Sequence, residues 1–141
     1  MKKAAVLTAL CLITAVVTGC VTAGNAPSDA EMIQSTLDNM KVALESKNID
    51  LLMSTFSEDF YHPEVGGKAE GRELLQAAID AGYLDDGVVT FEDMEIEMNE
   101  DGTATVYPVD LAGPPGAVSI ELKLKKEEGG WLILELAPDG I

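Results

Sequence analysis

Apolar residues in the first third of the chain recur at the spacing of a helix. From Ser28 to about residue 47 they lie three or four positions apart, which predicts a helix with one inward face. Ser28 and Glu31 have the spacing of a capping box, in which each side chain bonds the other residue's backbone N–H. We therefore expect the helix to begin there. Its inward positions are Ile33, Leu37, Met40 and Leu44.

Two further helices are expected before the pattern changes. The first covers Ile49–Phe56, and Phe60–Tyr61 then predicts a brief extended piece. A loop rich in glycine and charge follows over Pro63–Gly71. The next helix is expected over Arg72–Ala81, with Gly82 as the residue that ends it. The positions that this helix should bury are Leu74, Leu75, Ala78 and Ile79.

Beyond Gly87 the apolar period becomes two, which is the period of strands with one solvated face. Turn-forming residues at Asn99–Gly102, Gly113–Gly116 and Glu127–Gly130 separate these strands. Pro108 lies inside one of them, and because proline cannot donate to a ladder it demands a bulge or an edge position. The expected strands cover residues 93–98, 103–111, 118–125 and 131–136.

Three helices followed by a meander of strands predict an α+β fold rather than an alternating one. In the last strand, Trp131 and Ile133 alternate with three leucines. If the leucines face the helices, Trp131, Ile133 and Tyr107 form an outer apolar patch that would suit a homodimer. Outward charges such as Glu121 and Lys123 oppose sheet-to-sheet contact, so the pattern leaves dimerisation open. The leucines are Leu132, Leu134 and Leu136.

The start of the chain is typical of an export signal rather than of a folded domain. A short basic segment precedes the apolar run Ala4–Val17, which is shorter than the roughly 20 residues that a membrane-spanning helix needs. Residues 17–20, Val-Thr-Gly-Cys, resemble the bacterial lipobox, so we expect cleavage before Cys20 and acylation of its thiol. The predicted organisation is a signal peptide over 1–19, a lipidated cysteine and tether over 20–27, and one domain over 28–141.

The charge of the expected mature chain limits its partners. Without Lys2 and Lys3, 7 basic side chains remain against 25 acidic ones, a formal balance of −18. Such a surface repels nucleic acid and anionic headgroups, so membrane attachment is expected through the lipid on Cys20 alone. Cys11 leaves with the signal, so the domain has no free thiol for catalysis, disulfides or zinc. We expect no cofactor and no metal.

A resemblance to a known family rests on the segment from Ala43 to Ile79. It contains Phe56 at the end of a short helix, then Glu58-Asp59, Phe60-Tyr61 and Gly71-Arg72-Glu73. In this order the residues resemble the nuclear transport factor 2-like family, especially its polyketide-cyclase-like (SnoaL-like) and ketosteroid-isomerase-like branches. The resemblance covers about residues 28–138. It implies a cone, in which three N-terminal helices pack on a curved, mostly antiparallel sheet of about four to six strands.

The family also implies a candidate for catalysis. In ketosteroid-isomerase-like members an aspartate before a proline in this loop acts as general base, and His62 before Pro63 matches that position. Imidazole suits proton transfer at neutral pH, with Asp59, Glu64 or Asp110 to orient the ring. Met40, however, matches the oxyanion-stabilising tyrosine of that branch and offers no donor. A histidine with a purely structural role is the alternative.

Two further groups are candidates for binding. Arg72, the only arginine, could hold a ligand carboxylate beside Tyr61, or could pair with Glu58 or Asp59 and fix the loop. Residues 97–102 imitate the front of an EF-hand loop, but they begin with glutamate, and Pro108 falls where a bidentate glutamate is required. A solvated hairpin is therefore the better interpretation.

Two functions follow from these patterns. The first is a non-enzymatic cell-envelope lipoprotein that binds a small apolar ligand in its cone or an envelope protein through its sheet. The second is an isomerase, dehydratase or cyclase with His62 as general base. Val21 after Cys20 predicts the periplasmic face of the outer membrane in a Gram-negative source, and the outer face of the plasma membrane in a Gram-positive one.

Overall fold

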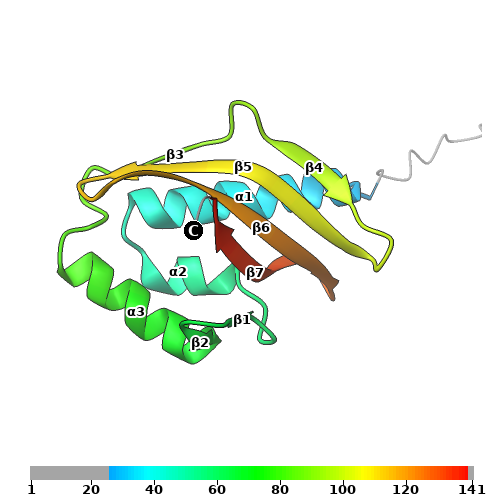
Figure 1. Ribbon diagram of the computed structural model, residues 1–141. Coiled ribbons are helices and arrows are strands. Elements are labelled where there is room, and N and C mark those ends of the chain that lie inside the picture. Colours follow the sequence, from blue (N-terminus) through cyan, green and yellow to red (C-terminus); the bar gives the residue numbers. More distant parts are fainter. Residues whose placement is uncertain (1–25, 140–141) are drawn as a thin grey trace, which may run out of the picture.

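Three helices precede the sheet, in the predicted order (Figure 1). The computed structural model describes residues 26–139, so the predicted signal, Cys20 and most of the tether lie outside the described residues. The helices are α1 (Asp29–Glu45), α2 (Ile49–Ser54) and α3 (Lys68–Asp80). Within residues 26–139 no helix has both the length and the apolar content to cross a bilayer.

The predicted capping box at the start of α1 is confirmed. The Ser28 hydroxyl accepts from the Glu31 N–H at 3.2 Å, and the Glu31 carboxylate accepts from the Ser28 N–H at 2.7 Å. These bonds satisfy two of the free donors at the helix start. The inward stripe is also confirmed, since Ile33, Leu37 and Met40 are buried.

The third helix begins four residues earlier than predicted, because Glu70 caps it. The Gly67 N–H donates to the Glu70 carboxylate at 3.0 Å. This bond satisfies a free donor at the helix start, although Gly67 has no side chain to cap the helix itself. The predicted loop is therefore shorter, and its Gly66–Gly67 forms a strand, β2, that pairs with β1 (Tyr61–His62) just before the loop. At the other end Gly82 has a φ of +78° and follows the last turn, as predicted.

The predicted burial of α3 is wrong in one respect. Leu74 is 55% exposed, whereas Leu75, Ala78 and Ile79 are partly buried. The helix packs against α2 and β2, so only a narrow strip of its surface is covered. Leu74 belongs to the apolar stripe in sequence but faces away from these contacts.

Five antiparallel strands form the main sheet, in the order β3-β5-β6-β7 with β4 also paired to β5. Pro108 lies in the middle of β5 at a shift in register, so the predicted bulge is confirmed. On the other side of β5, β4 pairs before Pro108 and β3 pairs after it. Pro108, which has no N–H, therefore lies in the gap between these two partner strands. The strands are β3 (Val88–Thr90), β4 (Glu95–Met98), β5 (Thr103–Gly113), β6 (Gly116–Glu127) and β7 (Gly130–Pro138).

The predicted faces are wrong for the first half of β7, and a second bulge separates that half from the second, where Leu136 packs against the core as expected. Trp131 and Ile133 are 1% and 0% exposed, so they face the helices rather than solvent. Leu124 pairs with Ile133 but Lys123 pairs with Glu135, which leaves Leu134 as an extra residue in β7. Beyond it the faces exchange, and Leu136 lies opposite the buried Leu122. The outer apolar patch therefore loses both residues, although Tyr107 does remain exposed.

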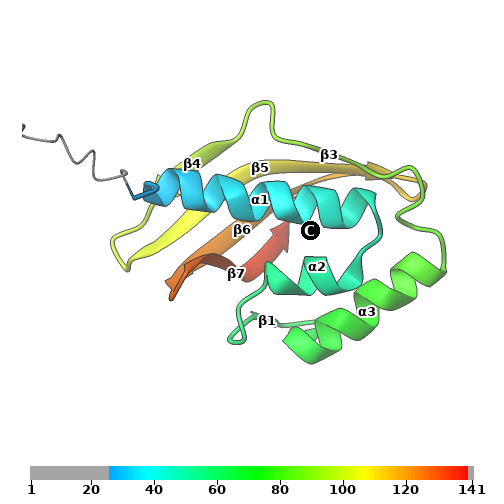
Figure 2. The same cartoon turned by 180° about the vertical axis from the view of Figure 1, so that it is seen from behind.

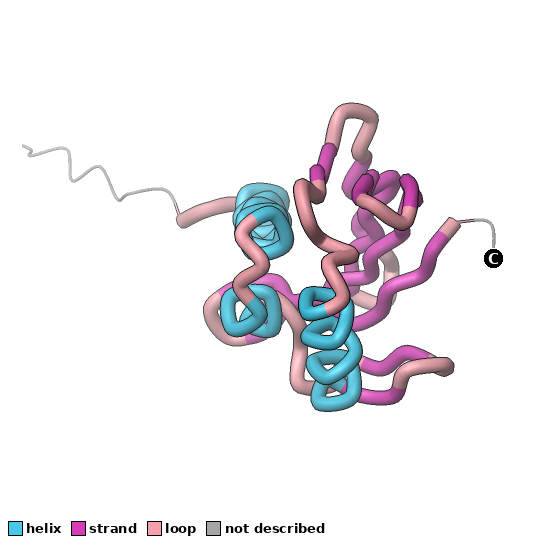
Figure 3. Tube along the Cα trace, turned by 90° about the vertical axis from the view of Figure 1, so that its left-hand side faces the viewer, coloured by secondary structure: helices cyan, strands magenta, loops and turns pink. Residues whose placement is uncertain are grey.

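The helices lie on one side of the sheet, and the core fills the space between them. Figure 2 shows α1 across the inner face, and Figure 3 shows the helical and strand layers from the side. Thr36 and Trp131 close the layers at one end, where the Thr36 hydroxyl donates to the Trp131 carbonyl at 2.6 Å. The largest fully buried apolar side chains are Trp131, Ile33, Leu37, Met40, Leu52, Leu122, Leu124, Ile133, Val106 and Val109.

Candidate functional site

The inner face of the sheet is occupied by side chains of the protein itself. Leu37 and Leu52 from the helices meet Leu122, Leu124 and Ile133 from the strands, and each of the five is at most 2% exposed. Native cores of this kind pack at the density of organic crystals. A ligand placed here would have to displace core side chains.

A large hollow lies on the opposite side, over the outer face of the sheet, and we call it the outer groove. It has a volume of about 980 Å³. Thr105, Lys123 and Glu135 are paired across three strands and form its floor. The segment around β1 stands along one side, and the end of β7 along another. Its lining is Asp59, Tyr61, His62, Pro63, Glu64, Asn99, Asp101, Thr105, Glu121, Lys123 and Leu134–Pro138.

Three of the predicted site residues, Asp59, Tyr61 and His62, are brought together in this groove. Tyr61 is 60% exposed on β1. His62 does not face the packed core but borders the groove, and its Nδ1 accepts from the Glu64 N–H at 3.2 Å. In the neutral ring that bond assigns the proton to Nε2 and occupies the lone pair that a general base would use.

The other predicted site residues are engaged elsewhere. Asp59 accepts a hydrogen bond from Lys125, which raises the pKa of that lysine. Asp110 accepts from the Ser119 hydroxyl, in a separate hollow beyond the outer groove. Among residues 26–139 neither acid is bonded to His62, and the third candidate, Glu64, bonds the ring only through its backbone N–H, so the expected base and its orienting acid are not assembled. Catalysis by His62 stays a prediction.

Arg72 forms an ion pair, which agrees with its structural interpretation, but the partner differs from both expected ones. Its guanidinium donates to Asp50 at the start of α2. Glu58 pairs instead with Lys68, and Asp59 with Lys125. The Arg72 pair therefore joins α3 to α2, and Arg72 does not line the outer groove.

The electrostatics of the outer groove are acidic. Five carboxylates line it, and Lys123 is the only lysine in the lining. Hydrogen bonds from the Thr103 hydroxyl and then its N–H lower the pKa of Asp101, so this carboxylate is charged at neutral pH. Lys123 lies 3.6 Å from Asp101 and 3.9 Å from Glu135, which leaves it shared between two acids. The carboxylates are Asp59, Glu64, Asp101, Glu121 and Glu135.

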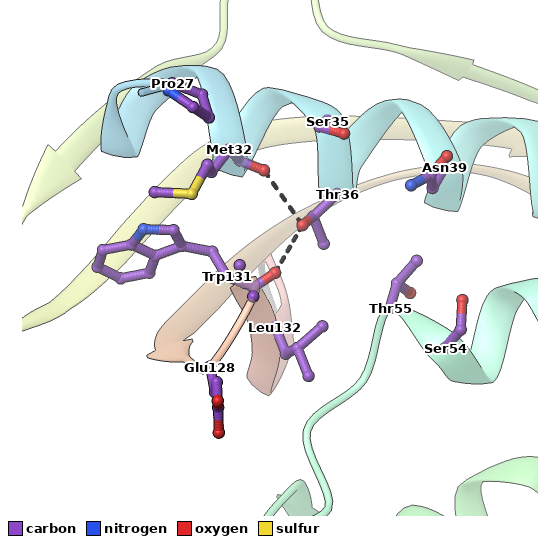
Figure 4. A pocket seen from close by; sticks show the side chains of 12 residues that line it. Pro27, Met32, Ser35, Thr36, Asn39, Ser54, Thr55, Glu128, Trp131 and Leu132 are labelled. Atoms are coloured by element: carbon purple, nitrogen blue, oxygen red, sulfur yellow. Dashed lines mark hydrogen bonds between the residues drawn. The ribbon is translucent and has the colours of Figure 1, made fainter. Parts of the chain in front are cut away.

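A smaller hollow of about 450 Å³ lies between α1 and the start of β7 (Figure 4). Met32, Thr36 and Trp131 line its upper part, and Thr55 comes from the end of α2. The hydroxyls of Thr36 and Thr55 already donate to backbone carbonyls, at 2.6 Å in both cases. These hydroxyls join elements of the fold, so the hollow has fewer polar side chains available for binding than the outer groove.

No metal site is formed by the described residues. Within 26–139, no three histidine, cysteine, aspartate or glutamate side chains converge on a point where they could hold an ion. Residues 99–102 form the turn between β4 and β5, with Gly102 at a φ of +82°. The hairpin interpretation of this segment is confirmed.

Sequence reasoning missed most of the outer groove. The sequence pattern predicted Glu121 and Lys123 only as outward residues of a strand, and it assigned Ala137 to no strand, although all three line the groove. Their alternation with buried positions was visible, but their proximity to Asp59–Glu64 was not. That proximity depends on how β1 lies beside β7, which no local pattern indicates.

The chain matches no protein-family model and no curated protein in sequence. Its fold does match solved structures. A protein of unknown function with a cystatin-like fold from Nostoc punctiforme is 16% identical, with a TM-score of 0.63 over 79% of this chain and 91% of that one. A nuclear transport factor 2-like protein of unknown function from Shewanella oneidensis is 17% identical, with a TM-score of 0.62 over 79% and 98%.

A third structure, an uncharacterised protein with a cystatin-like fold from Caulobacter vibrioides, is 14% identical. Its TM-score is 0.64 over 78% of this chain and 87% of that one. At such identities the likeness shows the fold alone. The α+β cone that the resemblance implied is confirmed.

Proposed function

We propose that this protein, a nuclear transport factor 2-like cone filled by its own side chains, is lipid-anchored in the cell envelope and binds a protein partner through its outer groove. The filled interior is the observation that carries this proposal. Leu37, Leu122 and Ile133 are 0% exposed where a small apolar ligand would otherwise lie. Recognition is therefore assigned to the outside of the sheet.

The charge of the groove supports a partner with basic side chains. Five carboxylates line the groove beside one lysine, within an expected mature chain of net charge −18. Opposite charge on a partner increases the rate of encounter and excludes acidic competitors. A cationic segment of another envelope protein fits this surface.

The proposed anchor is the acylated Cys20. The anchor and tether together are eight residues, 20–27, which precede the N-cap Ser28 and span at most about 3.3–3.6 Å each when extended. Two or three acyl chains hold a protein to a bilayer durably. The domain would then work within a few nanometres of the membrane, on the periplasmic face of the outer membrane or the outer face of the plasma membrane.

Photo-crosslinking in the native host tests the groove. A benzophenone amino acid at Ala137, an exposed residue of the groove, should capture an exported protein, whereas the same group at Val42 on α1 should not. The adduct should fall several-fold in the double variant Glu64→Lys/Glu121→Lys and persist in Glu92→Lys, which changes charge outside the groove. Equal adducts from both positions, or no adduct at Ala137, would contradict the proposal.

Cysteine replacement tests the anchor separately. Cys20→Ser should abolish incorporation of an alkyne fatty acid and release the protein from the membrane fraction, because the thiol that carries the diacylglycerol is gone. Cys11→Ser is the matched control and should leave both readouts unchanged. Labelling that survives Cys20→Ser would show that the anchor lies elsewhere.

A further inference from the structure

The side of the sheet opposite β7 ends in two short strands, β3 and β4, which both pair with β5 (Figure 1). The free edge of β3 is closed by two side chains of α1. The Lys41 ammonium donates to the Val89 carbonyl at 2.7 Å, and the Val89 N–H donates to the Glu45 carboxylate at 3.2 Å. The backbone groups of Val89 that point away from β5 are therefore satisfied.

The free edge of β4 is open. The Asn99 N–H donates to the Thr103 carbonyl at 2.8 Å, which fixes the alternation of hydrogen bonds along the β4–β5 ladder. Counted from that pair, the backbone groups of Ile96 and Met98 point away from β5. Among residues 26–139, no strand or loop forms backbone hydrogen bonds with them. The helix α1 packs against β3 and β7, and β4 packs chiefly against β5.

Acidic and apolar side chains alternate along this edge. Glu95 and Glu97 lie on the outer face of the sheet, and both are exposed. Ile96 and Met98 lie on the inner face, opposite buried residues of β5. Ile96 packs against the core, whereas Met98 is 50% exposed. A strand added here would meet carboxylates on one face and apolar side chains on the other.

We propose that the free edge of β4 binds a protein segment of alternating basic and apolar residues as an added β-strand. This inference goes beyond the outer groove and does not depend on it. The N–H and carbonyl groups of Ile96 and Met98 provide the backbone bonds of strand addition. Because β4 has only 4 residues, the added strand is short, and its basic side chains supply recognition through Glu95 and Glu97.

A second copy of this chain is a poor occupant of the same edge. If two copies of β4 paired antiparallel with Ile96 opposite Ile96 or Met98, glutamates of the two copies would lie directly opposite each other. Like charges in such positions destabilise a sheet, and proteins commonly use charged side chains to keep their sheet edges from pairing with copies. The same glutamates attract a basic segment.

Hydrogen exchange of the purified full-length protein tests the edge directly, because the N–H groups of Ile96 and Met98 lack a partner before the segment binds. The probe is a capped octapeptide of alternating lysine and valine. At a peptide concentration of about ten times its Kd, exchange at these two amides should slow by about tenfold. A peptide that binds only in the outer groove would leave both amides unchanged.

Charge variants test the recognition of the basic side chains. In Glu95→Lys/Glu97→Lys, the peptide concentration that gives half of this protection should rise by about tenfold or more. The matched control is Glu73→Lys/Glu128→Lys, which changes the charge equally at exposed positions elsewhere. It should leave the half-protecting concentration unchanged.

A proline tests the backbone bonds. Met98→Pro removes an outward N–H and obstructs an added strand without removing a bond to β5, so Ile96 should lose its protection by the peptide. Met98→Leu keeps the N–H and should behave as the unmodified protein. Melting temperatures show whether both variants are folded.

Three results would overturn the proposal. The first is a peptide that does not bind, and the second is one that binds saturably while exchange at Ile96 stays unchanged. The third is protection of Ile96 before peptide is added, which would mean that the tether or a second copy already occupies the edge. Crosslinking at Ala137 judges the outer groove independently of these results.

Discussion

At the scale of single residues, Thr36 joins a helix to the sheet through one hydroxyl. Its oxygen lies 3.2 Å from the Met32 carbonyl within α1 and 2.6 Å from the Trp131 carbonyl of β7. A hydroxyl has a single proton, which goes to the nearer acceptor. The Trp131 carbonyl faces away from β6, so Thr36 provides the partner that a neighbouring strand would otherwise supply.

Replacement of Thr36 by valine should destabilise the domain by about 1–3 kcal/mol, because the buried Trp131 carbonyl loses its donor while the shape is conserved. Chemical denaturation followed by tryptophan fluorescence measures this directly, since Trp131 is the only tryptophan. Thr36→Ser keeps the hydroxyl and should cost less. Equal stability of Thr36→Val and the unmodified protein would show that water replaces the hydroxyl.

At the scale of elements, α1 depends on its capping box. Ser28→Ala removes the side-chain acceptor of the Glu31 N–H and should lower the free energy of unfolding by about 1 kcal/mol. Differential scanning calorimetry would report this as a lower melting temperature. Ser46→Ala, beyond the other end of α1, removes a hydroxyl without removing an N-cap and should have the smaller effect.

The same box predicts a dependence on pH. Hydrogen bonds from the Ser28 N–H and then its hydroxyl lower the pKa of Glu31 below its ordinary value of 4.5. The charged carboxylate therefore stabilises the fold above that value, and this contribution is lost as the pH falls through the lowered pKa. Glu31→Gln should be less stable than the unmodified protein near neutral pH and equally stable well below pH 4.5. A difference that persists in acid would contradict this.

Elements with local signals could be predicted from the sequence, and those set by distant contacts could not. The start of α1 is encoded within four residues, and Pro108 alone indicates a bulge. The faces of β7 depend instead on Thr55 and Ser57, which hold Ile133 across more than 70 positions of sequence. His62 could be assigned to the segment after α2, but its position over the outer face depends on distant contacts and could not be inferred.

At the scale of the whole molecule, repulsion between carboxylates opposes the ion pairs that join the elements. The pairs Lys47–Asp85 and Lys125–Asp59 link distant segments, but both are largely exposed. Exposed pairs contribute about 0–1 kcal/mol each. The full chain has a formal net charge of −16, so most of its carboxylates have no lysine or arginine to pair with. Such an excess destabilises the compact state.

Salt should therefore stabilise this protein. Raising sodium chloride from about 0.15 M to 1 M shortens the screening length from about 8 Å to 3 Å, which weakens the repulsion between carboxylates more than it weakens the few ion pairs. We expect a higher melting temperature, at about 3–6 °C for each kcal/mol gained by a domain of this size. Potassium chloride should act equally if screening is the cause. A melting temperature that falls with either salt would mean that the ion pairs outweigh the repulsion.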